Sequence, residues 1–220
     1  MKFEDRMQEN LSLALAERDI QALVAKFAYR DQEKWDQLAD TFWPDATLDI
    51  SWFSGTIGEF LAESRKLATS GKMLLKHLIG NPRVQISHDR ALSETDLVIM
   101  LRVTIGDPAI PVDVTSWARF FDRHECRNGQ WRISQRTAIY EKDRADPVAA
   151  GTAVRWTLAP QAMNGVPHEY RHLASAMMEL GRKQMPPAIV NGSAEQMRLE
   201  QDAERWLAET VGTLRPSISV

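Results

Sequence analysis

Four strand-like segments that follow one another between residues 74 and 143 constrain the fold of this chain more than any other feature. They read LLKHLIGNPRVQIS, ALSETDLVIMLRVTI, VDVTSWARFFDRH and QWRISQRTAIYEKD, and turn-forming residues separate them. Between the last two segments, Asn128 and Gly129 are typical of a hairpin turn, because both residues accept a positive φ. The pattern predicts a meander of antiparallel strands.

Helical segments and one further strand precede the meander. Residues 3–31 are expected to be helical, and a short second helix is expected from Glu33 to Phe42, ending near Pro44. The stretch DATLDISWF alternates as a strand, and residues 56–72 are expected to form a third helix. The predicted fold class is therefore α+β.

The character of the chain changes after Asp146. Residues 147–220 show no strand alternation, hold more than half of the ten prolines and contain two helix-like runs, at residues 168–183 and 193–210. We therefore expect one domain over residues 1–146 and an α-helical C-terminal extension after it. The extension is expected to pack over the sheet or over a neighbouring subunit.

Composition and charge narrow the classes of function. The chain has 220 residues and is 44% hydrophobic, which is enough for one good core. Its net charge of −3 comes without a basic cluster, so no nucleic acid partner is expected. No apolar run suits a signal peptide or a membrane span. The single cysteine, Cys126, excludes an intramolecular disulfide, and the expected location is the cytoplasm.

A carboxylate ends the apolar face of the first helical region. Ile20, Leu23, Val24 and Phe27 recur at helical spacing, and the next position on this face is Asp31. Because a buried and unpaired carboxylate is costly, this aspartate needs a partner from elsewhere in the chain.

Three stretches carry a resemblance to a known family. They are RDQEKWDQLADTFWPDATLDI, KHLIGNPRV and GQWRI. Over roughly residues 10–145, the sequence resembles the SnoaL-like, nuclear transport factor 2-like cones of the scytalone dehydratase type. The resemblance implies a cone-shaped, strongly curved antiparallel β-sheet, packed with N-terminal helices, that encloses a deep pocket. In catalytic members, the aspartate at the position of Asp31 bonds the histidine at the position of His77. A carboxylate fixes the tautomer of an imidazole and raises its basicity, so this pair can act as a general base.

Other residues are candidates for contacts with a substrate. Arg30 precedes the aspartate, and its constant charge suits a phenolate, carboxylate or carbonyl oxygen. The dehydratase has a tyrosine at this position and a second histidine where Ile105 stands, so scytalone itself is not implied as the substrate. Tyr29 is expected near the pocket mouth. Alternation places Ile50 and Trp52 on one strand face, where the indole would offer a stacking wall to an aromatic ring.

The register of the strand over residues 112–123 stays open at this stage. Either Ser116 and Ala118 face the pocket, or Trp117 and Arg119 do, and the latter two are candidate substrate-binding residues. The strand is apolar in both registers, and such a strand is usually covered on both faces. A homodimer or homotrimer is therefore expected.

One motif formally matches a zinc site. HEYRH places His168 and His172 four residues apart, as in metalloproteases. However, Pro167 precedes the first histidine, no third histidine follows, and no glycine-rich phosphate loop occurs in the sequence. We expect neither a metal nor a cofactor.

The resemblance implies a cofactor-independent lyase that acts on a hydroxylated aromatic or polycyclic small molecule. In this interpretation, Asp31 and His77 carry the acid–base chemistry, Arg30 assists, and elimination of water is the first expectation. Release of formaldehyde from a lignin-derived diarylpropane diol is a related expectation, because diarylpropane lyases occur in this superfamily. Isomerisation or dehydrohalogenation would use the same pair. The alternative from another class is a non-catalytic module for small-molecule binding or assembly.

Overall fold

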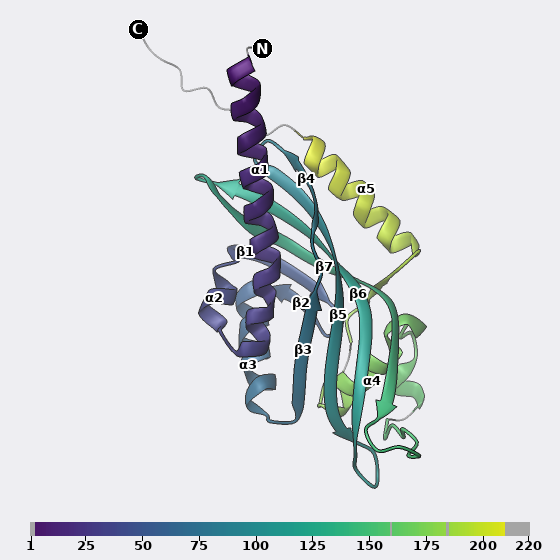
Figure 1. Cartoon of the computed structure of the whole chain (residues 1–220). Coiled ribbons are helices and arrows are strands. Elements are labelled where there is room, and N and C mark those ends of the chain that lie inside the picture. Colours follow the sequence, from purple (N-terminus) through teal and green to yellow (C-terminus); the bar gives the residue numbers. More distant parts are fainter. Residues whose placement is uncertain (1–2, 159, 184, 210–220) are drawn as a thin grey trace.

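The computed structural model describes residues 3–158, 160–183 and 185–209 and shows a long, curved, mostly antiparallel sheet with helices on both sides (Figure 1). The sheet order is β2-β1-β7-β6-β5-β3, with β4 paired to β5 and β8 paired to β7. The strands are β1 (Phe42–Ile50), β2 (Phe53–Thr56), β3 (Met73–Ile79), β4 (Arg83–Ser87), β5 (Arg90–Ile105), β6 (Ile110–Arg127), β7 (Gln130–Pro147) and β8 (Ile189–Val190).

The helices come before, within and after this sheet. They are α1 (Phe3–Ala25), η1 (Lys26–Gln32), α2 (Trp35–Ala39), α3 (Ile57–Thr69), η2 (Pro160–Met163), η3 (His168–Tyr170), α4 (Arg171–Glu179) and α5 (Ala194–Ala208). The predicted α+β class, with N-terminal helices, a curved sheet and C-terminal helices, is confirmed. Among the described helices, none combines the length and the apolar character that crossing a bilayer requires.

Two of the differences from the predicted boundaries involve a proline. The segment expected as one strand over residues 74–87 is broken into β3 and β4 at Gly80-Asn81-Pro82, where Gly80 N donates to Asp96 O at 2.8 Å. Strand β1 begins at Phe42, where a helix end was expected, and includes Pro44. Its pairing with β7 is irregular between Phe42 and Thr47, so a missing N–H is tolerated there.

The pleat of β6 decides which side chains face the inside of the curve. Val112, Val114, Ser116, Ala118 and Phe120 are buried, whereas the residues between them are only half-buried. The buried set faces the main hydrophobic cluster, which β1, β5, β7, α3 and α4 also supply. This settles the register that the sequence left open.

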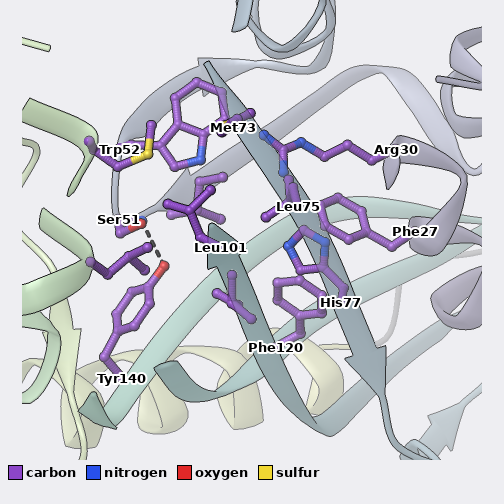
Figure 2. Close-up of a pocket in the computed structure, with 14 residues that line it drawn as sticks. Phe27, Arg30, Ser51, Trp52, Met73, Leu75, His77, Leu101, Phe120 and Tyr140 are labelled. Carbon is purple, nitrogen blue, oxygen red and sulfur yellow. Dashed lines mark hydrogen bonds between the residues drawn. The ribbon is translucent and has the colours of Figure 1, made fainter. Parts of the chain in front are cut away.

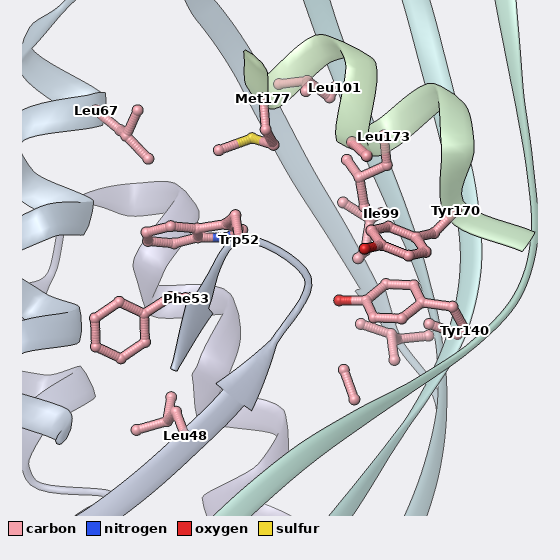
Figure 3. Packing of buried hydrophobic residues seen from close by; sticks show 14 of the residues in the cluster. Leu48, Trp52, Phe53, Leu67, Ile99, Leu101, Tyr140, Tyr170, Leu173 and Met177 are labelled. Atoms are coloured by element: carbon pink, nitrogen blue, oxygen red, sulfur yellow. The ribbon is translucent and has the colours of Figure 1, made fainter. Parts of the chain in front are cut away.

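The C-terminal segment covers both faces of the sheet. Helix α4 packs into the main cluster, where Leu173 and Met177 lie near Trp52 and Tyr140 (Figure 3). Helix α5 covers a second, smaller cluster on the outer face, formed by Leu92, Phe121, Ile139 and Ala203. The concave side is thereby closed over a small internal space.

Candidate active site

Asp31 finds its partner on the edge strand β3. Helix α1 passes into the tighter turns of η1, which end where Glu33 adopts the left-handed conformation, with φ of 55°. This turn directs the Asp31 carboxylate at His77. Its Oδ2 accepts the His77 backbone N–H at 2.6 Å, and its Oδ1 lies 2.7 Å from the imidazole Nδ1. The two side chains are only 3% and 5% exposed, so the pair is shielded from water.

This double contact fixes the orientation of the imidazole. A backbone N–H can only donate, so Oδ2 of the Asp31 carboxylate is a hydrogen-bond acceptor. Oδ1 of the same carboxylate is also an acceptor, which places the ring hydrogen of His77 on Nδ1. Nε2 is then left as the free, basic nitrogen. Burial lowers the pKa of His77 below its ordinary value of 6.5, and the positive charges of Arg30 and Arg136 lower it further, while Asp31 opposes them. The imidazole is therefore neutral at pH 7.

His77 opens onto a cavity of about 40 Å³ (Figure 2). Most of its walls are apolar and aromatic, and the polar side chains among them belong to Arg30, Ser51, His77 and Tyr140. A water molecule needs about 10–15 Å³ by this kind of measure, so a cavity of this volume has room for a few waters at most. An aromatic ligand requires its walls to move apart.

Arg30 brings a positive charge to the same cavity. The residue is 7% exposed, and its guanidinium lies over the rings of Trp52 and Phe60 at 5.4 and 5.7 Å. Its Nε donates to Ser64 Oγ at 3.4 Å. Burial lowers the pKa of Arg30 to about 10, although the charge of Asp31 opposes the shift. The group stays charged at neutral pH and can stabilise an anionic oxygen.

Of the five expected substrate contacts, Ile50 and Trp52 line the cavity, whereas Tyr29, Trp117 and Arg119 do not. Ile50 and Trp52 are lining residues, and the guanidinium groups of Arg30 and Arg182 lie 5.4 and 4.8 Å from the centre of the indole ring. Tyr29 lies outside the cavity, half-buried, with the Lys34 ammonium 5.4 Å from its ring centre. The expectation that Tyr29 reaches the pocket is corrected by this placement, since its neighbours Phe27 and Arg30 occupy the inward positions of η1.

Trp117 and Arg119 lie on the opposite face of the sheet. Trp117 packs against Lys142 at 4.9 Å, and Arg119 pairs with Glu94 at 2.6 Å and with Glu141 at 3.0 Å. The expectation that these two side chains line the pocket is therefore wrong. The reason is the pleat of β6, which turns the even-numbered residues inward over this stretch.

Tyr140 is a polar lining residue that the sequence interpretation missed. Its hydroxyl oxygen accepts the Ser51 backbone N–H at 2.8 Å (Figure 2). Burial raises the pKa of Tyr140 to about 12. Alternation along β7 puts Arg136, Ala138 and Tyr140 on one face, and this signal could have identified the tyrosine once the inward face of β7 was known.

Helix α4 is tied down at both ends over the cavity. Asp143 accepts the Leu173 backbone N–H at 2.8 Å at its N-terminus, and Glu179 accepts from Thr157 N and Oγ1, both at 2.7 Å, at the other end. Leu173 and Met177 from this helix line the cavity. The helical segment after β7 thus supplies part of the candidate site.

The two histidines of HEYRH lie away from the cavity lining. His168 begins η3, and the ring of His172 lies against Trp156 with centroids 6.1 Å apart. Across residues 3–158, 160–183 and 185–209, no group of three or more His, Cys, Asp and Glu side chains is placed to hold a metal ion.

Comparisons with known proteins agree with this architecture. The model of the SnoaL-like domain family matches residues 12–137. No curated protein matches the chain.

Several solved structures share the fold. A protein named as a candidate scytalone dehydratase, from Novosphingobium aromaticivorans, is 17% identical, with a TM-score of 0.51 over 68% of this chain and 99% of its own. A hexachlorocyclohexane dehydrochlorinase from Novosphingobium barchaimii is 16% identical, with a TM-score of 0.50 over 67% and 98%. A Mycobacterium tuberculosis protein of unknown function is 14% identical, with a TM-score of 0.51 over 79% and 98%. At these identities the likeness concerns the fold.

Proposed function

Because the chain belongs to the SnoaL-like domain family, we propose that it is a cofactor-independent lyase acting on a hydroxylated aromatic or polycyclic small molecule. The observation that carries this proposal is the buried Asp31–His77 pair, whose imidazole opens onto an apolar cavity. Two proteins of similar fold are named as a dehydratase and a dehydrochlorinase, and both names describe eliminations.

The proposed reaction begins at His77. Its Nε2 takes a proton from the carbon next to the C–O bond, and the electron pair of the C–H bond forms a C=C bond. The C–O bond breaks, and the oxygen leaves with its bonding pair. Asp31 holds the imidazole in place and stabilises the imidazolium that forms, while the Arg30 guanidinium stabilises negative charge on the substrate.

Formaldehyde release is a finer version of the same proposal. Here His77 takes the proton of a primary hydroxyl group, the C–C bond next to that carbon breaks to give formaldehyde, and its electron pair forms C=C as the benzylic hydroxyl departs. A diaryl substrate of this kind needs more space than a cavity of this volume offers. Because Leu173 and Met177 of α4 form part of the lining, we propose that movement of this helix provides the space.

Turnover of a panel of aryl diols tests the proposal. The purified full chain is incubated with each diol, with no added cofactor and with a chelator, and alkene and formaldehyde are measured. We expect product with at least one diol, and we expect His77→Gln and Asp31→Asn to lower kcat by about 10²–10⁴-fold. His88→Asn is the matched control, since this histidine is exposed and is not among the residues that line the cavity.

Two results would contradict the lyase proposal. One is a wild-type protein that turns over none of the diols, and the other is a folded His77→Gln variant that retains full activity. The mostly apolar lining favours a second candidate, a module that holds an apolar small ligand without converting it. In that case an aryl diol binds but is recovered unchanged.

A further inference from the structure

Tyr140 faces the same cavity as His77 but comes from a different strand of the sheet. Strands β6 and β5 lie between β7 and β3, so the two side chains approach the cavity from well-separated strands of the curved face (Figure 2). The tyrosine is 2% exposed. A substrate held against the imidazole would therefore have the phenol on another of its sides.

The phenolic oxygen of Tyr140 acts as a hydrogen-bond acceptor. Its oxygen accepts the Ser51 backbone N–H at 2.8 Å, so the phenol uses a lone pair in this contact and keeps its own hydrogen. The Ser51 side chain also hydrogen-bonds the phenol and, with the Ser51 N–H, opposes the effect of burial on the pKa of Tyr140. The phenol lines the cavity, so a substrate oxygen held there can take over its hydrogen while the Ser51 N–H keeps the phenolic oxygen in place.

The local structure holds this phenol rigidly. The backbone of Tyr140 pairs with β8, where Asn191 N donates to Tyr140 O at 2.8 Å. The pairing with β6 skips Glu141, so a bulge begins next to the tyrosine and fixes its direction. Its ring packs on Tyr170, with centroids 5.2 Å apart. A donor that needs no reorganisation is well suited to charge that develops during a reaction.

We propose that Tyr140 donates its phenolic proton to the oxygen that leaves the substrate, while His77 takes the proton from carbon. The inference rests on the proposed lyase function. As the C–O bond breaks, the departing hydroxyl gains the phenolic proton and leaves as water. The phenolate that remains is stabilised by the Ser51 N–H and by the charge of Arg30. The proton on His77 then returns to the phenolate through water, which resets both groups.

The acidity of the phenol agrees with this role. Burial raises the pKa of Tyr140 to about 12, which is still below the value of about 15.7 for bulk water. The transfer of a proton from this phenol to a departing hydroxide is therefore downhill. A chloride leaves without needing a proton, whereas a hydroxyl needs one. Loss of a proton donor should therefore slow the loss of hydroxyl and not the loss of chloride, whereas loss of a purely structural group should slow both.

The test uses Tyr140→Phe with Tyr170→Phe as the matched control. Tyr170 stacks on Tyr140, but its hydroxyl points to Pro186 O at 3.5 Å and does not line the cavity. For a diol that the wild type dehydrates, we expect Tyr140→Phe to lower kcat by about 10²-fold or more. The variant also removes the acceptor of the buried Ser51 N–H, so its thermal stability should fall, and kcat is compared at a temperature where both proteins are folded. For the matched substrate with chloride in place of the leaving hydroxyl, the same variant should retain kcat within about threefold. Equal losses for both substrates would overturn the donor role.

If no diol is turned over, the proposed lyase function is contradicted but the donor role of Tyr140 is not. A binding measurement then tests the donor role. The probes are 4-nitrophenol, at a pH where it is the phenolate, and nitrobenzene, which has no anionic oxygen. We expect Tyr140→Phe to weaken binding of the phenolate about tenfold or more and to leave nitrobenzene binding unchanged, in line with loss of one charge-assisted hydrogen bond. Tyr170→Phe should change neither affinity. A wild type that does not bind the phenolate, or an equal loss for both probes, would overturn the assignment.

Discussion

Next to the cavity, four buried polar residues form two side-chain pairs, Asp122 with Arg136 and His124 with Ser93. Asp122 and Arg136 are fully buried and joined by two hydrogen bonds, at 2.8 and 2.6 Å. The guanidinium lies 3.9 Å from the ring centre of Phe120, a wall of the cavity. Close by, His124 Nε2 lies 2.9 Å from Ser93 Oγ. Burial lowers the pKa of His124 to about 4.

This histidine predicts a pH dependence of stability. Unfolded His124 binds a proton near pH 6.5, whereas the native side chain does so only near pH 4. Between these values the unfolded state holds more protons, so the free energy of unfolding falls as the pH decreases, by about 3 kcal/mol from this group. Urea denaturation of wild type and His124→Gln at pH 7 and pH 4 measures the effect.

The variant should lose less stability than the wild type over that pH range. His77, whose pKa is also lowered, contributes to both proteins in the same direction, so the difference isolates His124. The control is His88→Asn, at an exposed position whose φ of 56° suits asparagine. An equal pH dependence in wild type and His124→Gln would contradict the account.

Sequence reasoning reached some of these residues and not others, for a physical reason. Asp31 stood out because it broke an apolar helical stripe, and the resemblance supplied its partner, His77. The contacts of Asp122 with Arg136 and of Tyr140 with Ser51 depend on strand register, and β6 and β7 shift register twice. The same ambiguity put Trp117 on the wrong face. Bulges are set by tertiary pairing, which alternation in one segment does not specify.

At the scale of elements, α4 is the part of the C-terminal segment that matters for the site. Its buried residues run from Leu173 to Met177, and Arg182 just beyond it pairs with Glu63 of α3 at 3.1 Å. The sequence predicted a helix here and left its packing open. Both faces of the sheet are apolar, so composition did not show that α4 takes the concave face and α5 the outer one.

The packing of α4 predicts the effect of shortening Met177. This side chain is 4% exposed and lines the cavity, so Met177→Ala should lower the free energy of unfolding by about 2–5 kcal/mol. Met197→Ala on α5 is the matched control, because that methionine is 54% exposed and its loss should change stability by no more than about 0.5 kcal/mol. Chemical denaturation measures both. Similar small effects for the two variants would show that α4 does not seal the cavity.

At the scale of the whole molecule, exposed apolar side chains on the outer face of β3 bear on whether the chains associate. Leu74 and Leu78 are 70% and 55% exposed there, beside half-buried Trp117 across the sheet, whereas α5 covers a different part of the same face. Adjacent exposed apolar side chains favour association. We therefore keep the prediction of a homodimer or homotrimer and assign its contact to this face.

Light scattering at micromolar concentration tests this prediction. We expect a mass of two or three chains for the wild type and of one chain for the double variant Leu74→Lys, Leu78→Lys. The control is Met197→Lys, which changes an exposed apolar residue on α5 and should leave the mass unchanged. A monomeric wild type would contradict the prediction.

The central claim is that Asp31 holds His77 as a neutral base with Nε2 free, and ¹⁵N NMR of the histidine side chains measures this most directly. The wild type is predicted to show His77 as the Nδ1–H tautomer at pH 7, with a pKa below its ordinary 6.5. In Asp31→Asn, the pKa should fall further, because the carboxylate raises it, and the single tautomer should be lost. A His77 that is charged at pH 7, or that carries its proton on Nε2, would contradict the account.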